Sequence, residues 1–92
     1  MIVKKGKSQV TFVFCPEAAC TRVDLAGTFN DWQPGQHKMT RQKDGSFRKR
    51  LNLGPGEHRY KFLVDGNWVE DHEAERQAPN PFGTSDSVLT VG

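Results

Sequence analysis

The sequence lacks any apolar run near the ~20 residues that a membrane-spanning helix needs. Its first seven residues carry charge, but they lack the apolar stretch and the small-residue cleavage site of a secretion signal. We therefore expect a cytoplasmic protein that makes no membrane contact.

Cysteine is scarce, with Cys15 and Cys20 as the two thiols of the chain. One pair without a secretion signal does not indicate a disulfide framework, so we expect ordinary thiols. The three histidines, His37, His58 and His72, are scattered singly and do not have the clustered spacing of a zinc site. The sequence predicts neither a metal nor a cofactor.

A strong charge of either sign is also missing. The 13 basic and 11 acidic residues leave a net charge of +2, which by itself does not imply a polyanionic partner. A length of 92 residues with 35% hydrophobic content suits one compact core. We expect a single domain that fills residues 1–92.

The apolar residues that are present recur at every second position, between short clusters of Gly, Pro, Asn and Asp. This pattern predicts strands over residues 8–15, 22–27, 38–42, 46–53, 57–64 and 87–91. The proline-rich stretch from Asp71 to Asp86 is predicted to be a loop. Short strands with regular turn signals favour an all-β, immunoglobulin-like antiparallel β-sandwich.

The most informative strand, residues 57–64, ends at Asp65-Gly66, a two-residue hairpin signal. The hairpin pairs Val64 with Asn67, and the three pairs that follow join residues 63, 62 and 61 to residues 68, 69 and 70. Tyr60, Phe62, Val64 and Val69 then face the core. Lys61 and Trp68 share the other face, as diagonal neighbours about 7 to 8 Å apart at the backbone.

An indole beside an ammonium group suits sugar recognition, because a pyranose has an apolar C–H face and a rim of hydroxyls. For Trp68 the pattern leaves burial in the core equally open, since large aromatics are usually well buried. Trp32 is less ambiguous because it lies in a polar, turn-rich stretch that continues through Gln33, Pro34 and Gly35.

Three segments carry a resemblance to a known family: residues 25–32 (LAGTFNDW), 54–68 (GPGEHRYKFLVDGNW) and 82–84 (FGT). The sequence from about Val10 to Val91 resembles carbohydrate-binding module family 48. That family includes the glycogen-binding domain of AMP-activated protein kinase β subunits and the N-terminal module of branching and debranching enzymes. The resemblance implies non-catalytic binding of α-1,4-linked glucan such as glycogen, starch or maltooligosaccharides.

The resemblance also implies a set of carbohydrate-binding residues. Trp32 and Trp68 match the two tryptophans that stack on glucose rings, and Lys61 matches a lysine that donates to hydroxyls. In the late loop, Phe82 and Thr84 match an apolar residue, usually leucine, and a threonine. Asp86 stands where the kinase-subunit pattern has asparagine, so it keeps an acceptor and loses the amide donor.

Other functions remain open. Family members are often fused to catalytic domains of glycoside hydrolase family 13, and some dock onto a partner enzyme, so a protein-docking or accessory module of such an enzyme or of a kinase complex is the alternative. Catalysis is not expected, because glycoside hydrolysis needs two facing carboxylates and the acidic residues from Asp65 to Glu75 lie in or beside turns. Nucleic-acid binding is not expected either, because alternation divides residues 48–50 between the two faces of a strand.

Overall fold

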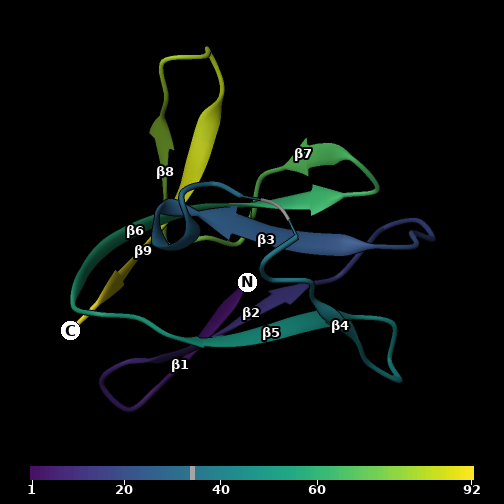
Figure 1. Cartoon of the computed structure of the whole chain (residues 1–92), viewed down its shortest axis with the longest axis horizontal. Coiled ribbons are helices and arrows are strands. Elements are labelled where there is room, and N and C mark those ends of the chain that lie inside the picture. The colour runs from purple at the N-terminus through teal and green to yellow at the C-terminus, as the bar shows by residue number, and fades with distance from the viewer. Residues whose placement is uncertain (34) are drawn as a thin grey trace.

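The computed structural model describes residues 1–33 and 35–92 and confirms the predicted immunoglobulin-like sandwich of two antiparallel sheets (Figure 1). Sheet A contains, in spatial order, β1 (Ile2–Lys5), β2 (Gln9–Phe14), β5 (Phe47–Asn52) and β4 (Thr40–Arg41). Sheet B contains, in spatial order, β3 (Val23–Gly27), β6 (Gly56–Val64), β9 (Ser85–Val91) and β8 (Arg76–Pro79), and β7 (Asn67–Val69) also pairs with β6. A 3₁₀ turn, η1 (Thr28–Asn30), follows β3. No helix in the described part of the chain is long and apolar enough to span a membrane.

The core lies between the sheets and is built by the period-two apolar positions of both. Phe12 of β2 and Tyr60 and Phe62 of β6 are almost completely buried, and the Phe12 and Tyr60 rings meet edge to face with centroids 5.0 Å apart. Burying each side chain of this size contributes about 1.5 to 3 kcal/mol. Because these residues point inward, their neighbours on β6 point to the outer face of sheet B.

Strand β6 is the longest strand and organises sheet B. On one edge it pairs with β3, from Tyr60 to Val64. On the other edge it pairs first with β9, up to Tyr60, and then with β7, from Phe62 onward. Lys61 therefore lies where β6 passes from one partner strand to the next, at the point where β7 and β9 diverge.

The predicted β6–β7 hairpin is confirmed, with Val64 opposite Asn67 and Leu63 opposite Trp68. Asp65 and Gly66 have φ angles of 47° and 86°, as the two central positions of a type I′ turn require. The ladder ends one pair earlier than predicted, because β7 ends at Val69.

Two strands were not predicted. The stretch predicted as a loop contains β8, which is an edge strand, so that Pro79 at its end interrupts no interior ladder. Strand β1 is also an edge strand, and its mostly exposed residues carry no alternating pattern. The strand predicted over residues 38–42 contracts to β4, while Lys38 forms an isolated bridge with Asp24 of sheet B.

Cys15 and Cys20 are free thiols, as predicted. Burial, followed by the nearby Asp65 carboxylate, raises the pKa of the Cys20 thiol. Pro34, which belongs to the predicted turn-rich stretch after Trp32, lies outside the described residues.

Candidate functional site

A groove of about 550 Å³ opens on the outer face of sheet B. It is lined by Trp32, Arg59, Lys61, Trp68, Asn80, Pro81, Phe82, Thr84 and Asp86. The structure therefore brings together all six residues that the sequence predicts for a site, although they come from three separate segments of the chain. The groove lies between the η1 loop, the β6–β7 hairpin and the β8–β9 loop.

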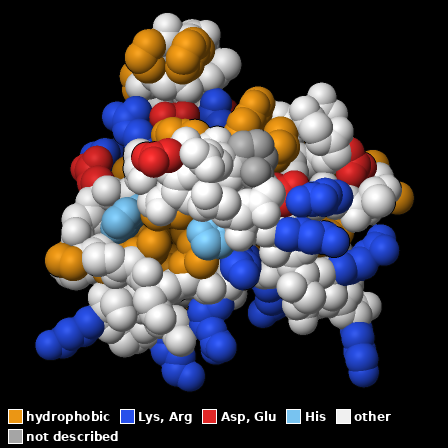
Figure 2. All heavy atoms as spheres, in the orientation of Figure 1, with side chains coloured by type: hydrophobic (Ala, Val, Ile, Leu, Met, Phe, Trp, Pro, Cys, Tyr) orange, Lys and Arg blue, Asp and Glu red, His pale blue; other side chains and the backbone are white. Residues whose placement is uncertain are grey.

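Two large apolar side chains of the groove stand in solvent. Trp68 on β7 is 49% exposed and Phe82 in the β8–β9 loop is 89% exposed. The alternative that Trp68 belongs to the core is thus wrong, because β7 turns this side chain away from the opposing sheet. Figure 2 shows hydrophobic side chains at the tip of the β8–β9 loop. Exposed apolar clusters of this kind mark interaction sites.

Trp32 is positioned by a short, tightly bonded loop after β3. The Asn30 side chain is buried, accepts a hydrogen bond from the Gly27 amide (3.0 Å) and donates to the Leu25 carbonyl (3.2 Å). A side chain at Gly27 would collide with the Arg59 carbonyl oxygen, 2.3 Å from the place of its first carbon atom. The loop can therefore lie flat on β6 and present the half-buried Trp32 indole to the groove.

Lys61 provides the polar centre of the groove. Its ammonium group donates to Thr84 Oγ1 (3.0 Å) and lies 3.7 Å from Asp86 Oδ1. Its side chain is only 11% exposed, so its stem is fixed and its remaining donors face the groove. The Thr84 hydroxyl accepts from Lys61 and therefore keeps its own proton for another acceptor.

Asp86 lies beneath this centre, with 7% of the residue exposed. Besides the Lys61 ion pair, its carboxylate accepts from Asn80 Nδ2 (3.0 Å) and from an Arg59 nitrogen (3.4 Å). These partners satisfy a buried charge that would otherwise be costly. The carboxylate therefore orients a lysine, an arginine and an amide at the same time.

Sequence reasoning missed Arg59, Asn80 and Pro81. Asn80 is the hub of the β8–β9 loop, since its side-chain oxygen accepts from the Phe82 and Thr84 amides (3.0 and 3.2 Å). Its side-chain nitrogen also donates to Thr84 Oγ1 (2.8 Å). An asparagine between two prolines is a typical turn-forming signal, which could have indicated this role.

The lining of the groove combines apolar and polar groups. Apolar faces from three side chains surround a small set of oriented donors and acceptors, as in sites that recognise neutral ligands. Among the described residues that line the groove, Asp86 is the one that carries a carboxylate. This carboxylate forms ion pairs with Arg59 and Lys61. Glycoside hydrolysis would need a second carboxylate facing it across the ligand.

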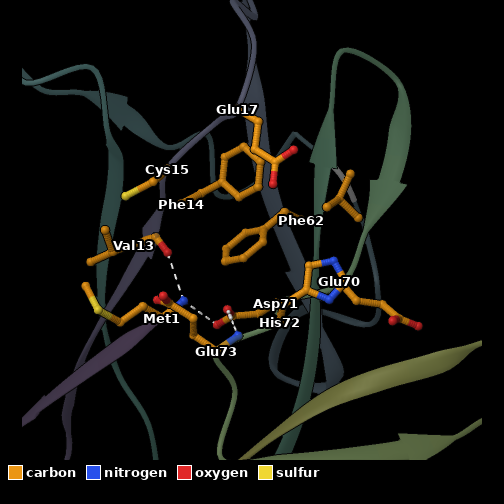
Figure 3. A pocket seen from close by; sticks show the side chains of 11 residues that line it. Met1, Val13, Phe14, Cys15, Glu17, Phe62, Glu70, Asp71, His72 and Glu73 are labelled. Atoms are coloured by element: carbon orange, nitrogen blue, oxygen red, sulfur yellow. Dashed lines mark hydrogen bonds and ion pairs between the residues drawn. The ribbon is translucent and has the colours of Figure 1, made fainter.

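A second cavity, of about 400 Å³, lies between the sheets (Figure 3). Its floor contains the packed rings of Phe14 and Phe62, with centroids 5.0 Å apart. Its buried Asp71 carboxylate accepts from the Tyr60 hydroxyl (2.7 Å) and the Glu73 amide (3.0 Å). Burial, followed by this contact with Asp71, raises the pKa of Tyr60. Asp71 is thus engaged in joining strands, and we assign the cavity a structural role.

Comparisons with known proteins show the family to which the chain belongs. A family model described as the glycogen recognition site of AMP-activated protein kinase matches residues 10–92. The β-1 subunit of 5′-AMP-activated protein kinase from Sus scrofa is 39% identical over 69 residues, 75% of this chain and 53% of the relative. The β-2 subunit from Mus musculus is 36% identical over the same length, which is 24% of that relative.

Among solved structures, a maltogenic amylase from S. marinus superposes with a TM-score of 0.71 at 24% identity. The match covers 95% of this chain and 14% of the amylase, and it shows the shared fold. This chain therefore spans only a part of each of these three proteins.

Proposed function

We propose that this chain, which belongs to the family of glycogen recognition sites of AMP-activated protein kinase, binds α-1,4-linked glucan chains in the sheet B groove without chemical conversion. The observation that supports this most is the convergence of Trp32, Trp68 and Phe82 around the Lys61 ammonium group. These residues come from segments up to 50 positions apart, and only the fold unites them.

The groove provides complementary groups for both parts of a glucose unit. The indoles of Trp32 and Trp68 cover the apolar C–H faces of the rings. Lys61 and Thr84 exchange hydrogen bonds with the hydroxyl rim, and Asp86 holds Lys61 in place for that role. Because the platform is open and hydroxyls exchange water for protein partners, the dissociation constant should lie in the micromolar to millimolar range.

The shape of the groove favours a curved chain. An α-1,4-linked glucan winds as an open helix, whereas a β-1,4-linked chain lies extended. Phe82 projects from the β8–β9 loop almost fully into solvent. A projecting ring can enter the concave side of a helical glucan, and it gains no contact from an extended one. We therefore assign selectivity for α-glucans, including glycogen and starch, to Phe82.

A docking role is the second candidate. The relatives are subunits of a kinase and the structural neighbour is an amylase, so the chain could serve as an accessory module that positions such an enzyme. In that case the groove would hold protein side chains in place of sugar rings. The two functions differ in one simple property, since a pure docking module does not bind glycogen.

Electrophoresis through a native gel that contains glycogen distinguishes the two functions. Glucan binding predicts that glycogen retards the wild-type protein and that Trp68→Ala abolishes most of this retardation. Val3→Ala is a matched control, because Val3 is also 49% exposed but lies on β1 in the other sheet, and it should migrate like the wild type. Equal migration of the folded wild type with and without glycogen would refute the proposed function.

A further inference from the structure

The net charge of +2 conceals a separation of charge between the two sheets. Residues 1–14 and 38–53, which form sheet A and its turns, contain nine basic residues and one acidic residue, a formal charge of +8. The rest of the chain contains four basic and ten acidic residues, a formal charge of −6. The basic residues of the first group are Lys4, Lys5, Lys7, Lys38, Arg41, Lys43, Arg48, Lys49 and Arg50. Figure 2 shows Lys and Arg side chains along the side where Figure 1 places sheet A.

Several of these cations share the outer face of sheet A. Val10 and Phe12 of β2 point into the core, so Thr11 and Val13 lie on the opposite face of the strand, where Val13 is nevertheless buried. Their partners on β5 are Arg50 and Arg48, which are exposed.

The adjacent edge strand continues the face. Val3 of β1 lies opposite Thr11 and is 49% exposed, and the exposed Lys5 lies opposite Gln9. Among the described residues, no ion pair joins a carboxylate to Lys5, Arg48 or Arg50. We call these residues, Val3, Lys5, Thr11, Arg48 and Arg50, the basic face.

We propose that the basic face is a docking surface for an acidic protein segment, separate from the groove. Charge complementarity supplies the attraction, and arginine can pair with carboxylates through two parallel hydrogen bonds. Thr11 on β2 lies between Lys5 on the edge strand and the two arginines on β5, so the centre of the face is less charged than its rim, as in a protein interface.

The same face is poorly suited to other anionic macromolecules. Single-stranded nucleic acids need exposed aromatic rings on which bases stack, but the aromatic side chains of β2 and β5 (Phe12, Phe14 and Phe47) belong to the core side. A membrane surface would favour several exposed aromatic or large aliphatic anchors, whereas Val3 is the one exposed apolar side chain among the residues of the basic face. An acidic polypeptide needs neither feature.

Fluorescence anisotropy with a labelled decaglutamate peptide at low ionic strength tests the proposal. The wild type should bind, and Arg48→Gln/Arg50→Gln should weaken binding by about tenfold or more, because two unpaired cations are lost. Arg76→Gln is the control, since Arg76 is an exposed arginine on β8 that already pairs with Glu57 at 2.8 Å. It should change the affinity by less than about twofold. Lys5→Gln, on a different strand, should weaken binding in the same direction as the double variant.

Several outcomes would overturn the proposal. These are absence of peptide binding to the wild type, an equal loss in Arg76→Gln, or tighter binding of a labelled oligothymidylate or of phosphatidylserine vesicles than of the peptide. Maltoheptaose binding reports on the fold independently, because the groove lies on the other sheet. The affinity for maltoheptaose should be the same in the double variant as in the wild type. A saturating concentration of the peptide should not change it either.

Discussion

Trp32 holds its indole in the groove from a backbone conformation that is costly for a large side chain. Its φ angle is 58° and that of the preceding Asp31 is 54°, so two consecutive non-glycine residues lie in the left-handed region. Such strain is frequent at functional sites. In this chain it turns the backbone so that Trp32 lines the same groove as Lys61 and Trp68 of the β6–β7 hairpin.

Comparing two substitutions at Trp32 separates binding from strain. Trp32→Ala and Trp32→Gly both remove the indole, and both should reduce affinity for maltoheptaose by about 1 to 3 kcal/mol. Glycine adopts this backbone conformation without a steric penalty, so Trp32→Gly should be more stable than Trp32→Ala by about 1 kcal/mol. Urea denaturation measures the difference. A glycine variant less stable than the alanine variant would show that the conformation carries no strain.

At the scale of elements, the β8–β9 loop is expected to act as one unit through Asn80. Asn80→Ala removes the acceptor that fixes the Phe82 and Thr84 amides, so Phe82 loses its defined position. Asn80→Ala and Phe82→Ala should each weaken maltoheptaose binding by about 1 kcal/mol. The double variant should lose little more than either single variant, because both remove the same contact. Additive losses, measured by calorimetry on folded variants, would contradict this coupling.

The elements differ in how well the sequence predicts their structure and their part in the site. The β6–β7 hairpin follows from alternation and from Asp65-Gly66, which together place Trp68 and Lys61 on one face. Strand β8 could not be predicted, because its pairing depends on β9 and its sequence carries a proline and no alternation. The hub role of Asn80 likewise depends on contacts within a folded loop. Phe82, Thr84 and Asp86 follow from the family resemblance alone, and the convergence of all six site residues requires the fold.

At the scale of the whole molecule, composition is a poor guide to surface charge. After forming β3 in sheet B, the chain returns to sheet A, and this places the two basic segments, residues 1–14 and 38–53, in the same sheet. The net charge of +2 gives no sign of this concentration of positive charge. The separation also has a consequence for stability, because it allows ion pairs between the two oppositely charged parts of the chain. Lys4 of β1 contacts Glu75, which in turn accepts from the Thr90 amide of β9 (2.9 Å).

This connection predicts a small, acid-sensitive contribution to folding. The Lys4 ammonium group, followed by the Thr90 amide, lowers the pKa of Glu75 below its usual value of 4.5. The stabilisation is therefore present above about pH 4.5 and is lost as pH falls through the lower pKa of the folded state. Glu75→Gln should lower the thermal midpoint slightly at pH 7 and hardly at all at pH 3. The effect should stay below about 1 kcal/mol, since both side chains are substantially exposed. An equal difference at the two pH values would contradict the linkage.

The central claim, that the sheet B groove selects a curved α-glucan, is tested most directly by calorimetric titration of the wild type with maltoheptaose and with cellohexaose. We predict measurable heat and a micromolar to millimolar dissociation constant for maltoheptaose, and no binding of cellohexaose. Phe82→Ala should weaken binding of maltoheptaose while the fold stays intact. Comparable binding of both sugars by the wild type, or no heat with millimolar maltoheptaose and folded protein, would contradict the claim.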